Sequence, residues 1–327
     1  MRSTGIARGE SRLRPTRDPP LDWRFRGGRT LIGIDWGTTT ARAYRFDAAG
    51  NVVDECSAPL GVQKVEPGRF RAALETLLGG GIPAGSRLLA CGMIGSRQGW
   101  VEVPYLDCPA DLAAIAAALA KVRDTALAIV PGLICRDADG VPDVMRGEET
   151  QVLGALEEAS SRQAVVLPGT HSKWALAGKS GIETFATFMT GELYAVLREH
   201  SILGRLAAVG SDPDAFERGV RSSLGSRVGL SHELFSARTL ALTDTLASAG
   251  VADYLSGLLI GAEVAAGRRW LESRAADPLR ITLVGDAMLC SRYRRAFALA
   301  GIDANLGPSD AAARGLWRIA QRARMVP

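Results

Sequence analysis

The hydrophobic positions near the start of the chain form three short runs that predict strands. The runs cover residues 31–35, 41–46 and 52–55, and segments rich in glycine, threonine, aspartate and asparagine separate them. Short strands joined by such turns form a β-meander. Apolar residues at helical spacing then predict a helix over 67–78, and a further apolar run predicts a strand over 87–93.

The same order of elements begins again in the second half of the chain. Apolar runs at 165–167, 173–177 and 182–188 are again separated by glycine-containing turns, and a helix is predicted from Thr190, which we interpret as its cap. The second set lies about 130 residues after the first. Such an internal repeat predicts two related α/β halves with a cleft between them.

The remaining segments are predicted from the same patterns. They are, in order, a helix from its cap Asp111 to about residue 122, a buried strand over 126–135, a helix over 148–159, helix-rich sequence over 213–274, strands over 280–284 and 302–306, and a helix over 309–322. We therefore divide the chain into a tail at 1–28, an N-terminal domain at 29–160 and a C-terminal domain at 161–327.

The positive charge of the chain is concentrated at its start. The 327 residues carry a formal net charge of +4, yet residues 1–30 hold eight arginines and three acidic residues, so the remainder carries −1. A nucleic-acid-binding body would carry clustered Lys and Arg on one face, so this distribution argues against nucleic acid as a partner. The arginine, proline and glycine content of the tail predicts that it is disordered.

Cysteine usage and hydropathy narrow the class of protein further. The five cysteines are scattered and form no CxxC pair, which is typical of reduced thiols in the cytoplasm and speaks against a structural zinc site. The longest apolar run that we identify, around 111–122, is shorter than the roughly 18 residues of a membrane-spanning helix, so no membrane partner is predicted. We expect a cytoplasmic protein, and the sequence leaves a homo-oligomer open.

The first turn carries residue types that bind phosphate and magnesium. Asp35 ends a predicted strand and is followed by Gly37 and three hydroxyl residues, Thr38, Thr39 and Thr40. Glycine lets the backbone approach an anion, backbone N–H groups and hydroxyls donate hydrogen bonds to phosphate oxygens, and a carboxylate can hold Mg²⁺ through water. The alternative interpretation is an ordinary hairpin turn.

A second turn of the same kind opens the second half at the matching place. It contains Gly169, Thr170 and His171, and Lys173 follows. Two such turns that face one another across a cleft can hold a triphosphate from both sides, so we predict that all four residues bind the nucleotide. Taken singly, Lys173 is equally well explained as a solvated strand residue and His171 as a turn residue without a partner.

Three stretches of the sequence resemble motifs of the actin/hexokinase/Hsp70 superfamily. IGIDWGTTTARAY and VLPGTHSKWAL are similar to its two phosphate turns, and ITLVGDAML is similar to its adenosine motif, with Asp286 after Gly285 where the family usually has a further glycine. The resemblance implies a two-domain actin-like (ribonuclease H-like) ATPase fold of the α/β class, with a duplicated β-meander and helix. It also implies that ATP and Mg²⁺ bind in the cleft and that Gly285 and Asp286 lie near the purine.

Within that superfamily the chain resembles the 2-dehydro-3-deoxygalactonokinases. The similar stretches are GMIGSRQGWVEVPYLDCPA, DVMRGEETQVLGAL, LPGTHSKW, TFMTGELYAVL and LFSARTL, and together they span most of residues 31–327. This resemblance implies that MgATP phosphorylates a small sugar acid, 2-dehydro-3-deoxy-D-galactonate, at its 6-hydroxyl to give 2-dehydro-3-deoxy-6-phosphogalactonate in galactonate catabolism.

A Gly-Glu-Glu helix start between the two turns supplies the candidate base. A similar helix start carries the catalytic base in the related exopolyphosphatases, and this resemblance implies that role for Glu148, with Glu149 as the second choice. Phosphoryl transfer often needs a carboxylate that accepts the hydroxyl proton. The alternative is structural, because acids in the first turn of a helix stabilise its dipole without any catalysis.

A long loop over 92–109 follows a predicted strand at the expected edge of the cleft, and loops of this length are often functional. It offers the sugar acid a hydroxyl, a guanidinium, an amide and a flat ring, from Ser96, Arg97, Gln98 and Trp100. Because arginine pairs bidentately with carboxylates, Arg97 is the first candidate for the substrate carboxylate, with Arg146 and Arg238 as rivals. A surface loop with a structural ion pair is the alternative.

Two other functions are compatible with the fold. A phosphohydrolase of the exopolyphosphatase type would share the fold and the Glu-Glu helix but would use water in place of the sugar hydroxyl. A non-enzymatic actin-like switch would bind ATP and then polymerise or regulate. The polar loop with Arg97 favours the kinase over both.

Overall fold

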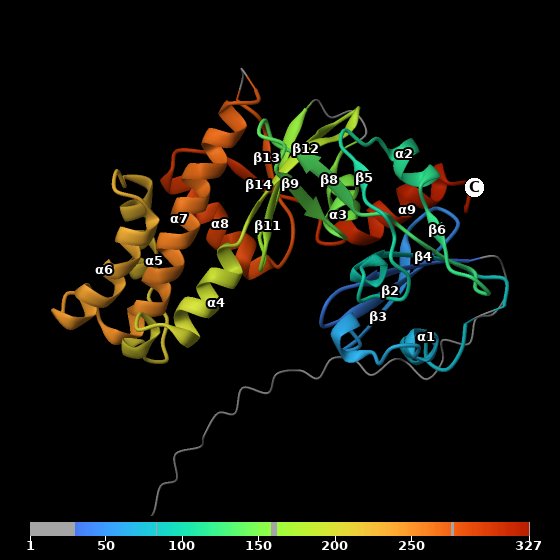
Figure 1. The fold of residues 1–327 in the computed structure, drawn as a ribbon, viewed down its shortest axis with the longest axis horizontal. Coiled ribbons are helices and arrows are strands. Elements are labelled where there is room, and N and C mark those ends of the chain that lie inside the picture. Colours follow the sequence, from blue (N-terminus) through green and yellow to red (C-terminus); the bar gives the residue numbers. More distant parts are fainter. Residues whose placement is uncertain (1–29, 83, 158–161, 276–277, 327) are drawn as a thin grey trace, which may run out of the picture.

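The computed structural model describes residues 30–82, 84–157, 162–275 and 278–326. The predicted disordered tail at 1–28 lies outside these residues, as does the predicted boundary between residues 160 and 161. The elements of the described part form two lobes, and the helices between α4 and α8 gather at the end of one lobe (Figure 1).

The first half of the chain builds a six-stranded sheet. Its strand order is β3-β2-β1-β4-β7-β6, and β1 pairs antiparallel with β2 and parallel with β4. The strands are β1 (Leu31–Trp36), β2 (Ala41–Phe46), β3 (Val52–Ala58), β4 (Arg87–Gly92), β6 (Ala120–Lys121) and β7 (Leu127–Ile129). The predicted meander is therefore confirmed.

The second half repeats this arrangement in a five-stranded sheet. Its order is β12-β11-β10-β13-β14, and β10 pairs antiparallel with β11 and parallel with β13, as β1 does with its own neighbours. The strands are β10 (Gln163–Leu167), β11 (Ser172–Gly178), β12 (Gly181–Phe188), β13 (Ile281–Leu283) and β14 (Ala304–Leu306). The internal repeat is thus a duplication of strand topology.

A third, three-stranded sheet corrects one prediction. Residues 126–135 are not one buried strand, because β7 ends at Ile129 and the chain enters a different sheet at Leu133 after Pro131 and Gly132. The order of this sheet is β5-β8-β9, from β5 (Leu106–Asp107), β8 (Leu133–Arg136) and β9 (Pro142–Met145). The Asp143 carboxylate fastens it to the second sheet by accepting hydrogen bonds from the Thr187 backbone N–H at 2.7 Å and hydroxyl at 2.6 Å.

The helices cover and connect the sheets. They are α1 (Phe70–Leu77), α2 (Leu112–Ala117), α3 (Glu148–Ala155), α4 (Thr190–His200), α5 (Pro213–Leu224), α6 (Leu230–Leu242), α7 (Val251–Glu272), α8 (Ala287–Leu299) and α9 (Ala311–Arg322). Short 3₁₀ turns are η1 (Val62–Lys64), η2 (Met93–Gly95), η3 (Gly204–Leu206) and η4 (Ser248–Gly250).

Two predicted helix details are wrong. Asp111 caps α2 by accepting a hydrogen bond from the Ala114 N–H, but the helix ends at Ala117 because Ala120 pairs with Ile129 as a strand. Thr190 is the first residue of α4, and the position before it, Met189, makes no side-chain cap.

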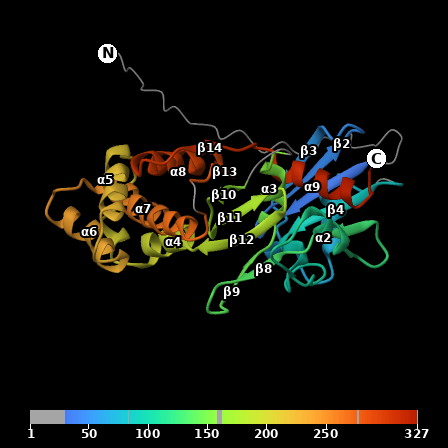
Figure 2. The ribbon, with the colours of Figure 1, turned by 90° about the horizontal axis from the view of Figure 1, so that it is seen from above.

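Helices α3 and α9 pack against each other between the two large sheets, as both views show (Figures 1 and 2). The helices approach closely because glycine stands at each contact. A Cβ atom on Gly154 of α3 would lie 1.8 Å from the Ala311 carbonyl oxygen, and one on Gly315 of α9 would lie 1.9 Å from that of Thr150. One continuous apolar core joins both helices to the facing sides of both sheets.

Helix α7 is the longest helix of the described residues and was underestimated from the sequence. With the turn before it, Ser248–Glu272 is long and apolar enough to span a membrane, and 72% of that window is buried inside the fold. The longest apolar segment is therefore this one and not residues 111–122. Its side chains pack against α5, α8 and the second sheet, which is the environment of a core helix.

Candidate active site

A cavity of about 380 Å³ opens where four strands of the two large sheets end. Strands β1, β4, β10 and β13 all run toward it, and the carboxyl ends of parallel strands are where α/β folds bind ligands. The predicted site residues in its lining are Asp35, Gly37, Thr38, Arg146, Glu148, Gly169, Thr170, His171 and Gly285. The structure thus brings together residues that are up to 250 positions apart in the sequence.

The first phosphate turn is held by backbone hydrogen bonds to η1. The carbonyl oxygens of Gly37, Thr38 and Thr39 accept from the N–H groups of Val62, Gln63 and Gly61, at 3.1, 3.2 and 3.1 Å. Because peptide units are planar and trans, the N–H groups that follow these carbonyls point away from η1. The backbone N–H groups of Thr38 and of the two exposed residues after it, Thr39 and Thr40, are therefore not used by η1, as a phosphate-binding turn requires.

Asp35 lies at the base of this turn in a half-buried position. Burial raises the pKa of its carboxyl group, and the charge of Glu148 raises it further, while Arg42 opposes both effects. Gly92 at the end of β4 allows this crowding, because a Cβ atom there would lie 2.7 Å from the Trp36 carbonyl oxygen and 3.5 Å from Asp35 Oδ1.

The second phosphate turn connects β10 to β11 and faces the same cavity. His171 pairs with Glu192 of α4, so the predicted lack of a partner is ruled out for its imidazole ring. Lys173 is not a solvated strand residue either, since its side chain is 5% exposed. Its ammonium group lies 3.5 Å from Glu148 Oε1 and donates to the His171 carbonyl oxygen at 3.3 Å.

Glu148 and Glu149 are neighbours in sequence but occupy different environments. The Glu148 side chain is 28% exposed and lines the cavity, and its Oε2 accepts a hydrogen bond from the Arg146 N–H at 2.9 Å. Glu149 is fully buried, and its two oxygens accept from the Gly147 N–H at 2.6 Å and the Thr150 hydroxyl at 3.0 Å. Of the two, Glu148 is therefore the carboxylate that a substrate can reach.

The carboxylates at this cavity fit a magnesium ion. The charge of Glu148 raises the pKa of Asp35, so the two carboxylates stand close to each other at this cavity. Carboxylate oxygens are preferred Mg²⁺ ligands, and magnesium sites commonly use one or two of them with water and phosphate oxygens. No group of three His, Cys, Asp or Glu side chains within the described residues forms an all-protein metal site.

The four loop residues predicted to bind the sugar acid are not in the lining of this cavity. Arg97 is exposed and pairs with Glu102 at 3.4 Å, Trp100 stacks on Phe70 with ring centroids 6.2 Å apart, and the Ser96 hydroxyl is buried. Gln98, which is exposed, is likewise not part of the cavity lining. The rival Arg238 lies on α6, where it donates to the Ile202 carbonyl oxygen at 3.2 Å.

Arg146 is the arginine that the structure places in the cavity lining. Its guanidinium group donates to the Val103 carbonyl oxygen at 2.7 Å and lies 4.3 Å from the centroid of the Tyr105 ring. The other two nitrogens, Nε and Nη1, are buried without a hydrogen-bond partner among the described residues. A buried, partly unpaired guanidinium is costly, so this group is suited to an anionic ligand.

The predicted adenosine residues have separate roles. Gly285 lines the cavity with a φ of 138°, a value that favours glycine. Asp286 instead caps α8, because its carboxylate accepts a hydrogen bond from the Leu289 N–H at 2.9 Å.

Several lining residues were not predicted from the sequence. They are Gly92, Met93, Gly147, Gln151, Leu167, Pro168 and Val284. Two of them carried a signal in the sequence, because Gly92 and Gly147 are glycines at the ends of predicted elements. Their φ values of 93° and 108° favour glycine. The others are recognisable only once the strand order is known.

The comparisons with known proteins decide the family. The family model described as 2-keto-3-deoxy-galactonokinase matches residues 35–319, which includes both phosphate turns and the Glu148 helix. The chain belongs to the 2-keto-3-deoxy-galactonokinase family.

Named members of this family are similar over nearly their whole length. A 2-dehydro-3-deoxygalactonokinase from Escherichia coli (strain K12) is 37% identical over 282 residues, which cover 86% of this chain and 94% of that one. A protein from Rhizobium meliloti (strain 1021), provisionally named a 2-dehydro-3-deoxygalactonokinase, is 35% identical over 300 residues, with 87% and 96% covered.

Solved structures support the same placement and the fold. A crystal structure from Sinorhizobium meliloti, provisionally named a 2-dehydro-3-deoxygalactonokinase, matches with a TM-score of 0.79 at 33% identity, covering 89% of this chain and 98% of that one. The activator of the 2-hydroxyisocaproyl-CoA dehydratase from Clostridium difficile, solved with bound ADPNP, matches with a TM-score of 0.50 at 12% identity, covering 90% and 96%, and shows the fold alone. The predicted two-domain actin-like fold is confirmed.

The two adjacent glutamates make a matched pair for testing the base in this kinase family. Glu148→Gln should lower kcat by roughly 10²–10⁴-fold, because general bases contribute about that much, while ATP still binds. Glu149→Gln should retain most of the activity, because the amide oxygen can accept from the Gly147 N–H and the amide nitrogen can donate to the Thr150 hydroxyl oxygen. Turnover measured by ADP release and ATP affinity measured by calorimetry separate the effects. Near-normal turnover of Glu148→Gln would remove Glu148 from the role.

The raised pKa of Glu149 predicts that the stability of the protein depends on pH. Burial, with the charge of Glu148, raises its pKa from an ordinary 4.5 to about 8 in the folded protein. Between these values the folded protein holds a proton that the unfolded chain has released, so the free energy of unfolding falls as the pH rises through this window. Glu149→Gln mimics the protonated group and cannot titrate.

Urea denaturation of both proteins from pH 5 to pH 8 checks this. The variant should gain stability relative to the wild type as the pH rises, by a few kcal/mol over the window. A stability difference that stays constant with pH would show that Glu149 does not carry a raised pKa.

Proposed function

We propose that this chain phosphorylates 2-dehydro-3-deoxy-D-galactonate at its 6-hydroxyl, with MgATP as the phosphoryl donor. The observation that carries the proposal is the single cavity in which two phosphate turns and Glu148 meet, in a chain of the 2-keto-3-deoxy-galactonokinase family. The names of its relatives give this sugar acid as the substrate class.

The roles of the residues follow from their positions. The backbone of Gly37–Thr40 and that of Gly169–His171 would bind the ATP phosphates from the two halves of the chain. Asp35 would hold Mg²⁺ through water, and the ion would offset charge on the transferring phosphoryl group. Glu148, with its side chain in the cavity, would accept the proton of the attacking 6-hydroxyl.

The ammonium group of Lys173 adds a link between the halves. It comes from β11 of the second sheet and lies 3.5 Å from the carboxylate of Glu148, which begins α3 in the first half. The pair would fix the base against the turn that binds the phosphates. Phosphoryl transfer depends mainly on such positioning and on charge stabilisation, because little covalent chemistry falls to the protein.

Arg146 is the residue that we assign to the carboxylate of the sugar acid. Two of its guanidinium nitrogens have no partner among the described residues, and arginine binds carboxylates with two parallel hydrogen bonds. One of them lies against Gly95, where an added Cβ atom would be 3.0 Å away. Binding therefore requires a small movement of the loop over 92–109 as the sugar acid enters.

Membership of the kinase family favours this function over a phosphohydrolase or a nucleotide switch. The cytoplasmic location, the absence of nucleic-acid and membrane partners and the possible homo-oligomer stay predictions. Galactonate catabolism is the role that the substrate implies.

A coupled ADP-release assay tests the function. With MgATP, ADP should form in proportion to added 2-dehydro-3-deoxygalactonate and much more slowly with its gluconate epimer or without a sugar acid. Release that does not depend on a sugar acid would favour a hydrolase instead. ATP binding without ADP release from either epimer would favour the switch.

Arg146 and Arg97 give a matched test of carboxylate recognition. Arg146→Gln should raise the KM for the sugar acid by about tenfold or more, since a hydrogen bond to a charged group contributes about 1.5–3 kcal/mol. Its KM for ATP should change little. Arg97→Gln, on the exposed loop, should leave both constants near the wild-type values. A raised sugar-acid KM in Arg97→Gln with a normal one in Arg146→Gln would reverse the assignment.

A further inference from the structure

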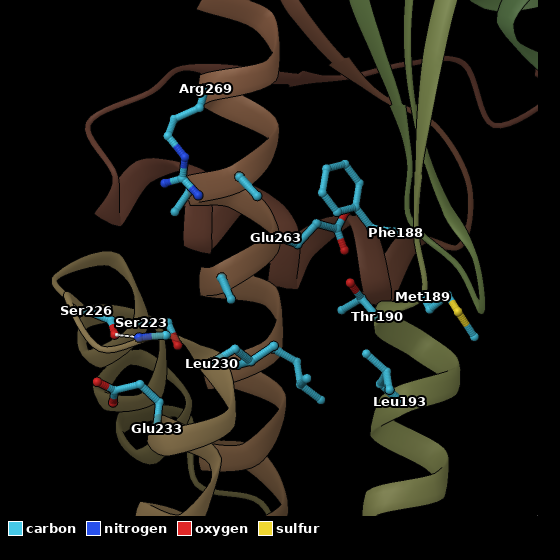
Figure 3. A pocket seen from close by; sticks show the side chains of 15 residues that line it. Phe188, Met189, Thr190, Leu193, Ser223, Ser226, Leu230, Glu233, Glu263 and Arg269 are labelled. Atoms are coloured by element: carbon cyan, nitrogen blue, oxygen red, sulfur yellow. Dashed lines mark hydrogen bonds between the residues drawn. The ribbon is translucent and has the colours of Figure 1, made fainter. Parts of the chain in front are cut away.

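A buried carboxylate lies behind the second phosphate turn and has no part in the mechanism above. Glu263 belongs to α7, far in sequence from both turns, and is 3% exposed. Figure 3 shows its side chain leaving α7 toward Phe188 and Thr190, where β12 ends and α4 begins. It borders a second cavity of about 330 Å³ between α4, α6 and α7.

Glu263 is connected to the phosphate turn by a chain of hydrogen bonds. Its Oε2 accepts from the Tyr293 hydroxyl at 2.6 Å, and the Tyr293 oxygen lies 2.9 Å from Ser172 Oγ. Ser172 Oγ in turn lies 3.4 Å from the Gly169 nitrogen and 3.5 Å from the Gly169 oxygen, inside the turn itself. The carboxylate is therefore three contacts away from the backbone that would bind phosphate.

An ionised Glu263 can only accept, and this sets the direction of the hydrogen bonds in the chain. A tyrosine hydroxyl has one proton, and that of Tyr293 points to Glu263, so Ser172 must donate its own proton to Tyr293. The Ser172 oxygen can then only accept from the Gly169 N–H. An acceptor-only group at the far end thus determines how the serine hydroxyl is oriented inside the turn.

The other Glu263 oxygen holds the strand that follows the turn. Trp174 of β11 donates its indole N–H to Oε1 at 2.8 Å. The indole ring lies directly against α7, because a Cβ atom on Gly267, one helical turn beyond Glu263, would lie 2.5 Å from that ring. Ser172 and Trp174, which are two residues apart on β11, are thereby both connected to the Glu263 carboxylate, Ser172 through Tyr293 and Trp174 directly.

A buried carboxylate at this place is costly, which indicates a specific role. Burial raises its pKa, and hydrogen bonds from Thr190, Tyr293 and Trp174 oppose that rise. An apolar side chain of the same size would avoid the cost of burial. It would leave the tyrosine hydroxyl and the indole N–H without an acceptor, and so leave the serine in the turn unoriented.

We propose that Glu263 is a positioning residue for ATP: through Tyr293 and Ser172 it holds the second phosphate turn in the conformation that receives the phosphates. The inference rests on the proposed function in assigning ATP to this turn. The role is indirect, because Glu263 itself lies behind the turn.

Three variants along the chain test the proposal. Glu263→Gln leaves a single acceptor oxygen for two donors, the Tyr293 hydroxyl and the Trp174 indole. Tyr293→Phe removes the central hydroxyl of the chain, and Ser172→Ala removes the hydroxyl inside the turn. Each should weaken MgATP binding by about five- to tenfold, the equivalent of roughly one ordinary hydrogen bond. The affinity for the sugar acid should stay within about twofold of the wild type. Calorimetric titration with each ligand measures both.

A double-mutant cycle and a matched control separate positioning from general loss of stability. Tyr293→Phe with Ser172→Ala should bind MgATP no worse than the weaker of the two single variants, because links of one chain are not additive. The control is Ser223→Ala, which removes a buried hydroxyl that donates to the Leu258 carbonyl oxygen on α7, away from the turn. It should lower the melting temperature and leave the affinity for MgATP unchanged.

The outcomes are distinguishable from failure of the proposed function. Wild-type protein that binds MgATP but releases no ADP with the sugar acid would contradict the kinase and leave this binding test intact. Folded Tyr293→Phe and Ser172→Ala with wild-type MgATP affinity would overturn the role of Glu263, even if Glu263→Gln does not fold. Equal losses of affinity for MgATP and for the sugar acid would also overturn it, since they would indicate a general structural effect.

Discussion

The crossing of α3 and α9 is the contact on which the rest of the molecule depends. Each helix comes from one half of the chain and packs toward the sheet of the other, since α3 contacts β10, β11 and β12 while α9 contacts β1 and β4. Gly154 and Gly315 let the two backbones touch. The two halves therefore share one apolar core, and neither sheet is covered on its inner face without the other half.

This crossing also assembles the candidate site. Glu148 begins α3, so the packing of that helix against the second sheet carries its carboxylate to Lys173 on β11. Asp35 reaches the same cavity from the first sheet. A site made by both halves of a duplicated fold can bring a base, a metal ligand and two phosphate turns to one point, which neither half contains alone.

Much of the fold could be predicted because duplicated strands with glycine-rich turns leave a strong local pattern. What the pattern could not supply was long-range pairing. The run over 126–135 reads as one strand, but its two parts pair with β4 and with β5, in different sheets. Similarly, α7 is apolar on nearly all sides because it is buried among α5, α8 and the second sheet, so it lacks the one-sided periodicity of a surface helix.

The candidate site shows the same limit at the level of single residues. From the sequence, Glu148 and Glu149 were both candidates for the base, and Arg97 ranked above Arg146 for the substrate carboxylate, because only residue type and loop length could be used. Consecutive helix residues point in directions about 100° apart, so one glutamate enters the cavity and the other the core. Likewise, packing against Val103 and Tyr105 brings Arg146 to the cavity, while Arg97 stays exposed. These outcomes follow from tertiary contacts that no local pattern encodes.

The two phosphate turns, alike in sequence, are held by different means. The carbonyl groups of the first turn accept hydrogen bonds from η1 and from Gly61 just before it. Residue 61 must be glycine for this contact, because a Cβ atom there would lie 2.3 Å from the Thr38 carbonyl carbon. The second has its serine hydroxyl oriented by Tyr293 and, behind it, by Glu263. The second turn also has a backbone support, because the Thr170 carbonyl oxygen accepts from the Glu192 N–H at 3.0 Å, and it too meets a glycine, since a Cβ atom on Gly191 would lie 2.4 Å from the Gly169 carbonyl oxygen. What the second half adds is a buried carboxylate that orients a hydroxyl inside the turn. Duplication of the fold therefore did not require duplication of all its supports.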